Sequence, residues 1–181
     1  MIEKLVKDIL SVINSKVDGF YLLPESICDD LVYKFNEIES EITIELYIDS
    51  NNDVNTFFLD GAYVSDEDVL EVSVIMNPSL SENYKEELYF ELIELITHEI
   101  QHIKQYENGV ILPLKQPKQP LKYYTQPHEI DAQIAGFKKR AKLESKPINE
   151  VVKNWFIKYE KIHRLSPKNV DIVMGKLLES V

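Results

Sequence analysis

Apolar residues near the start of the chain recur at helical spacing. Over residues 2–14 they return every three or four positions, as one face of an α-helix requires. The same period resumes after Pro24, a residue that suits the first turn of a helix, and continues to about Ile38. The pattern therefore predicts two N-terminal helices.

The apolar period then shortens to two residues. Residues 42–48 alternate apolar side chains with Thr, Glu and Tyr, which is typical of a half-buried strand. Two further strands are expected over residues 54–64 and 69–76, with a short polar turn between them. We therefore expect a small antiparallel or mixed sheet of three strands, and the short connections favour an antiparallel meander.

The next apolar pattern predicts one long helix, which starts near residues 81–82 and ends at the Asn-Gly pair 108–109. Leucines recur along one stripe of this helix, and Glu99 and His102 continue the same stripe. Burying such polar groups without a partner costs free energy, so their presence on an inward-facing stripe calls for a compensating partner.

The C-terminal part alternates between a loop and helices. Residues 110–126 are too rich in proline for a helix or a central strand, and we expect an extended loop that forms one wall of a cleft. A helix begins at Pro127, and two more are expected near 147–164 and 167–180.

The expected fold is a single α+β domain over residues 1–181. Strands and helices are segregated along the chain, which indicates the α+β class, and the length suits one domain. The small sheet is expected to pack on the long helix, with additional helices at both ends.

Charge and composition narrow the partners and the location. The net charge of −11 repels phosphate backbones and anionic lipids, so nucleic acid and membranes are not expected partners, and basic or neutral peptides are favoured. Apolar runs are short, the N-terminus does not resemble a signal peptide, and Cys28 is the single cysteine. We therefore expect a cytoplasmic protein, and its many Lys, Ile, Asn and Glu residues are typical of an AT-rich bacterial or phage genome.

The candidate chemistry lies within the long helix, where residues 98–102 read His-Glu-Ile-Gln-His, the H-E-x-x-H pattern. Residues four apart share one face of a helix, so the imidazoles of His98 and His102 can reach one zinc ion. Glu99 is then close enough to take a proton from a zinc-bound water during peptide-bond hydrolysis. The alternative is a coincidental spacing of core or surface histidines.

A catalytic zinc site needs a third protein ligand and keeps one position open for water. The densest group of candidates begins the helix at Pro127 and comprises His128, Glu129 and Asp131. These side chains point in different directions around a helix, so only one is expected to face the metal. The residues alone leave the choice among the three open.

The segments 97–102 (Thr-His-Glu-Ile-Gln-His) and 127–132 (Pro-His-Glu-Ile-Asp-Ala) together resemble zincin metallopeptidases of the gluzincin type, including small bacterial and phage-encoded members. In that family a glutamate on a second helix is the third zinc ligand. The resemblance therefore implies Glu129 as the ligand that joins the two histidines, Glu99 as the general base and a zincin-like fold.

This resemblance covers about residues 41–137, and the flanking helices match no family pattern. The chain has no Gly-x-x-His continuation after His102, which excludes the metzincin arrangement, and its second motif differs from the Asn-Glu-Ala segment of thermolysin. These two differences affect which zincin subfamily the chain resembles, and they leave the H-E-x-x-H motif itself unaffected.

Two residues near the proposed third ligand have two interpretations each. Tyr123 is a candidate catalytic residue, because a hydroxyl near zinc can stabilise an oxyanion, but it can also pack with Tyr124 as an aromatic pair. Asp131 is either a group that holds a ligand histidine or a solvated helix acid.

Three functions are compatible with these patterns. The first is a zinc-dependent peptidase that acts on a protein or peptide substrate. The second is a catalytically silent binding module or phage structural protein with the zincin fold and a retained zinc site. The third is a regulator that cleaves one specific repressor. Hydrolysis of a general substrate that depends on Glu99 distinguishes the first from the second.

Overall fold

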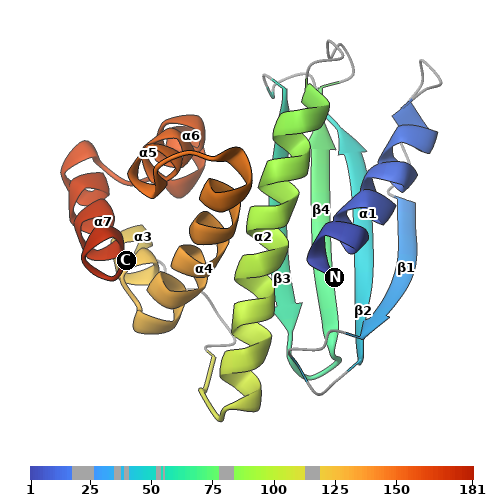
Figure 1. Cartoon of the computed structure of the whole chain (residues 1–181), viewed down its shortest axis with the longest axis horizontal. Coiled ribbons are helices and arrows are strands. Elements are labelled where there is room, and N and C mark those ends of the chain that lie inside the picture. Colours follow the sequence, from blue (N-terminus) through green and yellow to red (C-terminus); the bar gives the residue numbers. More distant parts are fainter. Residues whose placement is uncertain are drawn as a thin grey trace.

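A mixed sheet occupies one side of the molecule and a group of helices the other (Figure 1). The structure is a computed structural model that describes residues 1–17, 27–34, 38, 41–51, 54, 56–77, 84–112 and 119–181. The α+β class expected from the sequence is confirmed.

The sheet has four strands in the order β1-β2-β4-β3. They are β1 (Ile27–Lys34), β2 (Glu41–Ser50), β3 (Phe57–Val64) and β4 (Val69–Met76). β2 and β4 are parallel, whereas the pairs β1–β2 and β3–β4 are antiparallel. The sheet is therefore mixed, one of the two expected alternatives, but the predicted meander is wrong because β2 lies beside β4 rather than β3.

The helix predicted over residues 24–38 is wrong where the structure describes it. Ile27–Lys34 form β1, which pairs along its whole length with residues 41–48 of β2. Eight residues are too few for the apolar period to separate helix from strand, and Ile, Val and Tyr favour strands. Pairing with β2 gives the backbone groups of β1 their partners, so the sheet has four strands rather than three. Apart from Ile38, the rest of this segment lies outside the described residues.

One face of the sheet is buried and the other is partly exposed. Buried apolar side chains such as Leu46 and Val72 alternate along β2 and β4 with partly exposed ones. They share one core with α1 (Ile2–Val17) and α2 (Tyr84–Glu107), which both cover the same face (Figure 1). The N-terminal helix and the long helix expected from the sequence are confirmed.

The chain after α2 forms a second, helical half with its own apolar core. Its elements are α3 (Pro120–Tyr124), α4 (Pro127–Glu144), α5 (Ile148–Lys158), α6 (Glu160–His163) and α7 (Pro167–Glu179). Among the described residues, every helix is too short or too polar to cross a lipid bilayer.

Two predictions for this half need correction. The expected loop over 110–126 contains the helix α3, because Pro120 lies in its first turn, where a missing backbone N–H costs little. Residues 113–118 of the same loop lie outside the described residues. The helix expected over 147–164 is divided into α5 and α6 at Tyr159.

α2 and α4 approach each other closely where Gly136 faces the α2 backbone. A Cβ atom at Gly136 would lie 2.7 Å from the carbonyl oxygen of Glu94. One turn further along α4, Arg140 donates a hydrogen bond of 2.8 Å to the Glu94 carboxylate. Because only glycine permits this separation, Gly136 sets the distance between the two helices.

We expect Gly136→Ala to lower the free energy of unfolding by about 1–3 kcal/mol, because overpacking forces the helices apart although alanine favours a helix. Gly175→Ala on α7 is the matched control, since nothing lies within 4 Å of its added Cβ. The control should raise stability by up to about 1 kcal/mol. Urea unfolding monitored by circular dichroism measures both, and equal stabilisation would contradict the close contact.

Candidate metal centre

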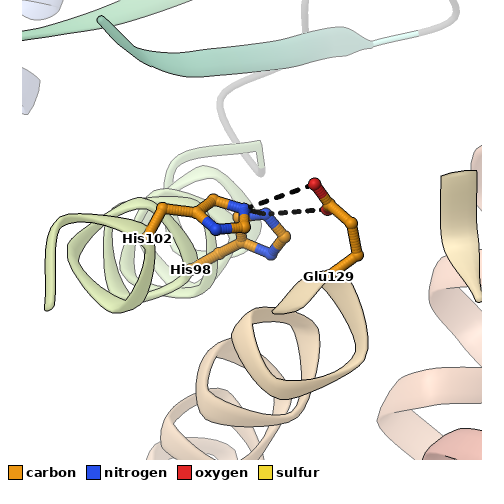
Figure 2. Close-up of side chains that lie close together, drawn as sticks. All are labelled: His98, His102 and Glu129. Atoms are coloured by element: carbon orange, nitrogen blue, oxygen red, sulfur yellow. Dashed lines mark hydrogen bonds and ion pairs between the residues drawn. The ribbon is translucent and has the colours of Figure 1, made fainter. Parts of the chain in front are cut away.

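α2 presents two imidazoles one helical turn apart, on the side that faces α4 (Figure 2). The Nε2 atoms of His98 and His102 lie 3.0 Å apart, and the rings meet edge to face. His102 is buried and His98 is partly buried. The four-residue spacing of the motif therefore brings both ring nitrogens to one point, as the sequence predicts.

Glu129 reaches the same point from the first turn of α4 (Figure 2). Its Oε2 lies 3.7 Å from Nε2 of His98, and its Oε1 lies 3.6 Å from Nε2 of His102. Pro127 begins α4, which brings this carboxylate close to the positive end of the helix dipole. The three side chains offer ligand atoms that all lie within 4.8 Å of one another.

The geometry of this group fits a divalent metal ion. A tetrahedral zinc ion with bonds of about 2.0–2.1 Å keeps its ligand atoms about 3.3 Å apart. The two Nε2 atoms lie 3.0 Å apart, and each lies 3.6 or 3.7 Å from a different oxygen of Glu129, so these separations lie around that value for a carboxylate that offers both oxygens. Oε2 of Glu129 is also buried and has no hydrogen-bond partner among the described residues, which is costly unless a cation lies against it. His98, His102 and Glu129 could therefore hold a metal ion.

Gln105 determines which nitrogen of His102 carries the proton. Its Oε1 lies 2.8 Å from Nδ1 of His102, and an amide oxygen only accepts, so Nδ1 is the donor. Its Nε2 donates to the backbone oxygen of His128 at 3.0 Å and to Oδ2 of Asp131 at 2.9 Å, which prevents the amide from turning over. Neutral His102 therefore has its lone pair at Nε2, as a metal ligand requires.

Glu99 lies beside the three donor residues without belonging to them. Its Oε1 is 3.8 Å from Nε2 of His98, and its Oε2 accepts the backbone N–H of Tyr63 in β3 at 3.1 Å. Burial is the main cause that raises the pKa of Glu99 to about 7; the charge of His102 opposes this rise and that of Glu129 adds to it. A carboxyl group with a pKa near 7 can accept and return a proton at neutral pH.

Two of the three donor residues, His98 and Glu129, have the protonation states that bind a cation. Burial lowers the pKa of His102, but its interactions with Glu129 and Glu99 outweigh burial, so the pKa of His102 is raised and a metal ion has to displace a proton there. Burial, together with the charge of His102, lowers the pKa of His98 to about 3, so its imidazole is neutral. Burial raises the pKa of Glu129, but the hydrogen bond with His102 and the charges of both imidazoles outweigh it, so the pKa is lowered overall. A neutral imidazole and an ionised carboxylate are the forms that metals bind.

Among the three candidates for the third ligand, the structure brings Glu129 to the histidines. Nε2 of His128 is buried without a partner and lies 3.6 Å from Oε1 of Glu129, but it is not in the group of three donors. Asp131 accepts hydrogen bonds from Gln101 at 2.7 Å and from Gln105 at 2.9 Å. Asp131 therefore holds the Gln105 amide, which in turn forms a hydrogen bond with His102. This is close to the expected role of a group that holds a ligand histidine, with Gln105 between the two.

Tyr123 forms the aromatic pair with Tyr124 that was one of its two interpretations. The two rings lie edge to face, at 5.0 Å between centroids, and the Tyr123 hydroxyl interacts electrostatically with the Glu129 carboxylate. Burial and the charges of Glu129 and Glu99 raise the pKa of Tyr123, so the hydroxyl keeps its proton. Its role in binding an oxyanion stays a prediction.

Two contributors to the site were missed in the sequence. Gln105 follows His102 by three residues, so helical spacing could have identified it as a neighbour. The backbone N–H of Tyr63 reaches Glu99 only because β3 packs against α2. No local pattern reveals such a contact.

Comparison with known proteins gives no relative for this chain: no family model, curated protein or solved structure matches it. The resemblance to gluzincins therefore depends on the two motifs alone. Any functional assignment depends on the donor atoms of His98, His102 and Glu129 and on the residues around them.

We expect Glu129→Ala to lose most of its bound zinc, because two histidines alone leave the coordination incomplete. Elemental analysis after dialysis against a weak chelator measures the zinc content. His128→Ala is the matched control and should keep a full equivalent. The opposite pattern would identify His128 as the third ligand.

Gln105→Leu is expected to weaken zinc affinity about 10–100-fold, because the proton of His102 is no longer held at Nδ1. Gln101→Leu is its control, since the Gln101 amide donates to the same Asp131 oxygen, whereas the hydrogen bond of Nδ1 of His102 is accepted by Gln105. Competition with a chromophoric chelator measures both affinities. Equal affinities for the two variants would show that Gln105 does not orient the ligand.

Proposed function

We propose that the protein is a zinc-dependent peptidase in which His98, His102 and Glu129 bind the metal and Glu99 is the general base. The position of Glu99 supports this most strongly: a buried carboxyl group lies 3.8 Å from His98 without belonging to the donor group. Structural zinc sites take four protein ligands, whereas catalytic sites take three and need a base nearby.

When bound, zinc supplies a Lewis acid that lowers the pKa of water and polarises the peptide carbonyl. Glu99 accepts the proton of the attacking water at Oε1, the oxygen nearest His98, and returns it to the leaving amine. The N–H of Tyr63 holds Oε2, so the carboxylate keeps one orientation during both transfers. Tyr123 supplies a hydroxyl hydrogen to the developing oxyanion.

The outward edge of β3 offers a way to hold an extended peptide. In the part of the sheet that the structure describes, β3 is an outer strand, and the N–H of Tyr63 points away from β4 towards Glu99. Outward-facing backbone groups alternate along an edge strand, so the N–H of Gly61, which donates to Oδ1 of Asp60 at 3.1 Å, faces the same way. A peptide that pairs with this edge brings its carbonyl groups close to Glu99.

The alternatives from the sequence differ from a peptidase in what they require of Glu99. A silent binding module or phage structural protein needs the metal but no base. A regulator that cleaves one repressor needs both, together with a single protein partner. The burial of Glu99 beside the donor group, without membership of it, favours the functions that include hydrolysis.

Glu99→Gln is expected to retain zinc and to lower peptide hydrolysis at least about 10²–10⁴-fold, since the amide cannot accept a proton. Casein and a mixed peptide library serve as substrates, with cleavage detected by mass spectrometry. Glu71→Gln is the matched control, because Glu71 lies on the partly exposed face of the sheet, and it should keep full activity. Absence of cleavage by the zinc-loaded wild type would favour the silent binding module.

A further inference from the structure

A cavity lies next to the candidate metal centre and is walled by aromatic rings. It has a volume of about 140 Å³ and is bounded by β3, by α2 and by the helical half, with His98 and Glu99 in its wall. Its aromatic walls comprise Phe58, Tyr123, Tyr124, Phe137, Trp155 and Tyr159. A substrate side chain next to the reacting peptide bond can enter this cavity.

The charged groups that line the cavity are all acidic. Asp60, Glu91, Glu94 and Glu99 take part in the lining, and no described lining residue is Lys or Arg. Arg140 and Lys158 hold the carboxylates of Glu94 and Glu91 but do not line the cavity themselves.

Among the acidic side chains that line the cavity, Asp60 has the weakest recorded interactions with other groups. The hydrogen bond recorded for it comes from the backbone N–H of its neighbour Gly61, at 3.1 Å. Asp60 is an exposed residue of β3 that lines the cavity. Its negative charge is therefore available to a cation that enters the cavity from solvent.

Gln133 indicates, independently of the acidic residues, that the cavity binds a molecule able to donate a hydrogen bond. The residue is only 6% exposed and lines the cavity, and its Oε1 atom is buried with no hydrogen-bond partner in the part of the chain that the structure describes. It lies one turn after Glu129 on α4, so it faces the same side as the metal centre. An acceptor left alone in this way costs free energy unless a bound molecule donates to it.

We propose that this cavity binds the positively charged side chain of a lysine or arginine in the peptide substrate. The apolar stem of such a residue packs between the aromatic rings, and its charged head lies against Asp60 and Gln133, with the ring faces adding cation–π attraction. This inference rests on the proposed function, because it assigns the substrate preference of that site. It also agrees with the charge of −11, which attracts basic peptides.

Binding to an inactive form tests the inference separately from catalysis. Blocked peptides that carry Lys, Arg, norleucine, Phe or Glu at one position are titrated by calorimetry into zinc-loaded Glu99→Gln. We expect the Lys or Arg peptide to bind at least about tenfold more tightly than the norleucine peptide. Trp155 is the only tryptophan in the chain and lines the cavity, so its fluorescence should change on binding.

Two variants in the same background locate the preference. Asp60→Asn, at an exposed strand position, and Gln133→Leu should each reduce the preference for Lys over norleucine severalfold. Asp171→Asn on α7 removes the same charge at an exposed position and should leave the preference unchanged. Equal or tighter binding of the norleucine, Phe or Glu peptide, or an unchanged preference in both cavity variants, overturns the inference.

The outcomes for the cavity and for the catalytic proposal are distinct. If wild-type enzyme cleaves peptides without any basic preference, the cavity assignment fails and the peptidase stands. If basic peptides bind selectively but no Glu99-dependent cleavage occurs, the peptidase fails and the cavity remains a binding site for basic side chains.

Discussion

The close crossing of α2 and α4 is the contact on which the candidate site depends. The histidines belong to one helix and the third donor to the other, so a shift of either helix would separate Glu129 from His98 and His102. Gly136 allows the two backbones to approach, and Arg140 ties α4 to Glu94. A glycine and an ion pair outside the donor group therefore maintain distances that the donor residues cannot set themselves.

Several buried carboxylates lie along α2, and their interaction partners differ between its N-terminal half and the H-E-x-x-H motif. Near its N-terminal half, Glu91 and Glu94 have cationic partners in Lys158 and Arg140, which offset the cost of desolvation. Near the motif, the Glu99 carboxylate accepts a backbone N–H and lies beside His98, and no ion pair with Lys or Arg is recorded for it among the described residues. The same helix thus carries carboxylates paired with cations of the helical half and one carboxyl group beside the donor residues.

The sequence predicted the motif-bearing parts best, because a four-residue spacing on a long helix determines local geometry. His98, Glu99 and His102 lie as the H-E-x-x-H pattern predicts, and Glu129 joins them as the resemblance implied. β1 was missed because its partner strand, rather than its own period, determines its conformation. The parallel pairing of β2 with β4 and the contact of Tyr63 with Glu99 likewise depend on long-range packing.

Each half of the molecule has its own apolar core, and the two cores support different parts of the candidate site. The core of the sheet and α2 supports both histidines and Glu99, whereas the helical core supports Glu129 and contributes Phe137. Much of the cavity wall thus belongs to a half that carries only one of the donor residues. Substitutions in α5 can therefore change the cavity wall while His98, His102 and Glu129 stay the same, so the lining and the donor group can diverge independently during evolution.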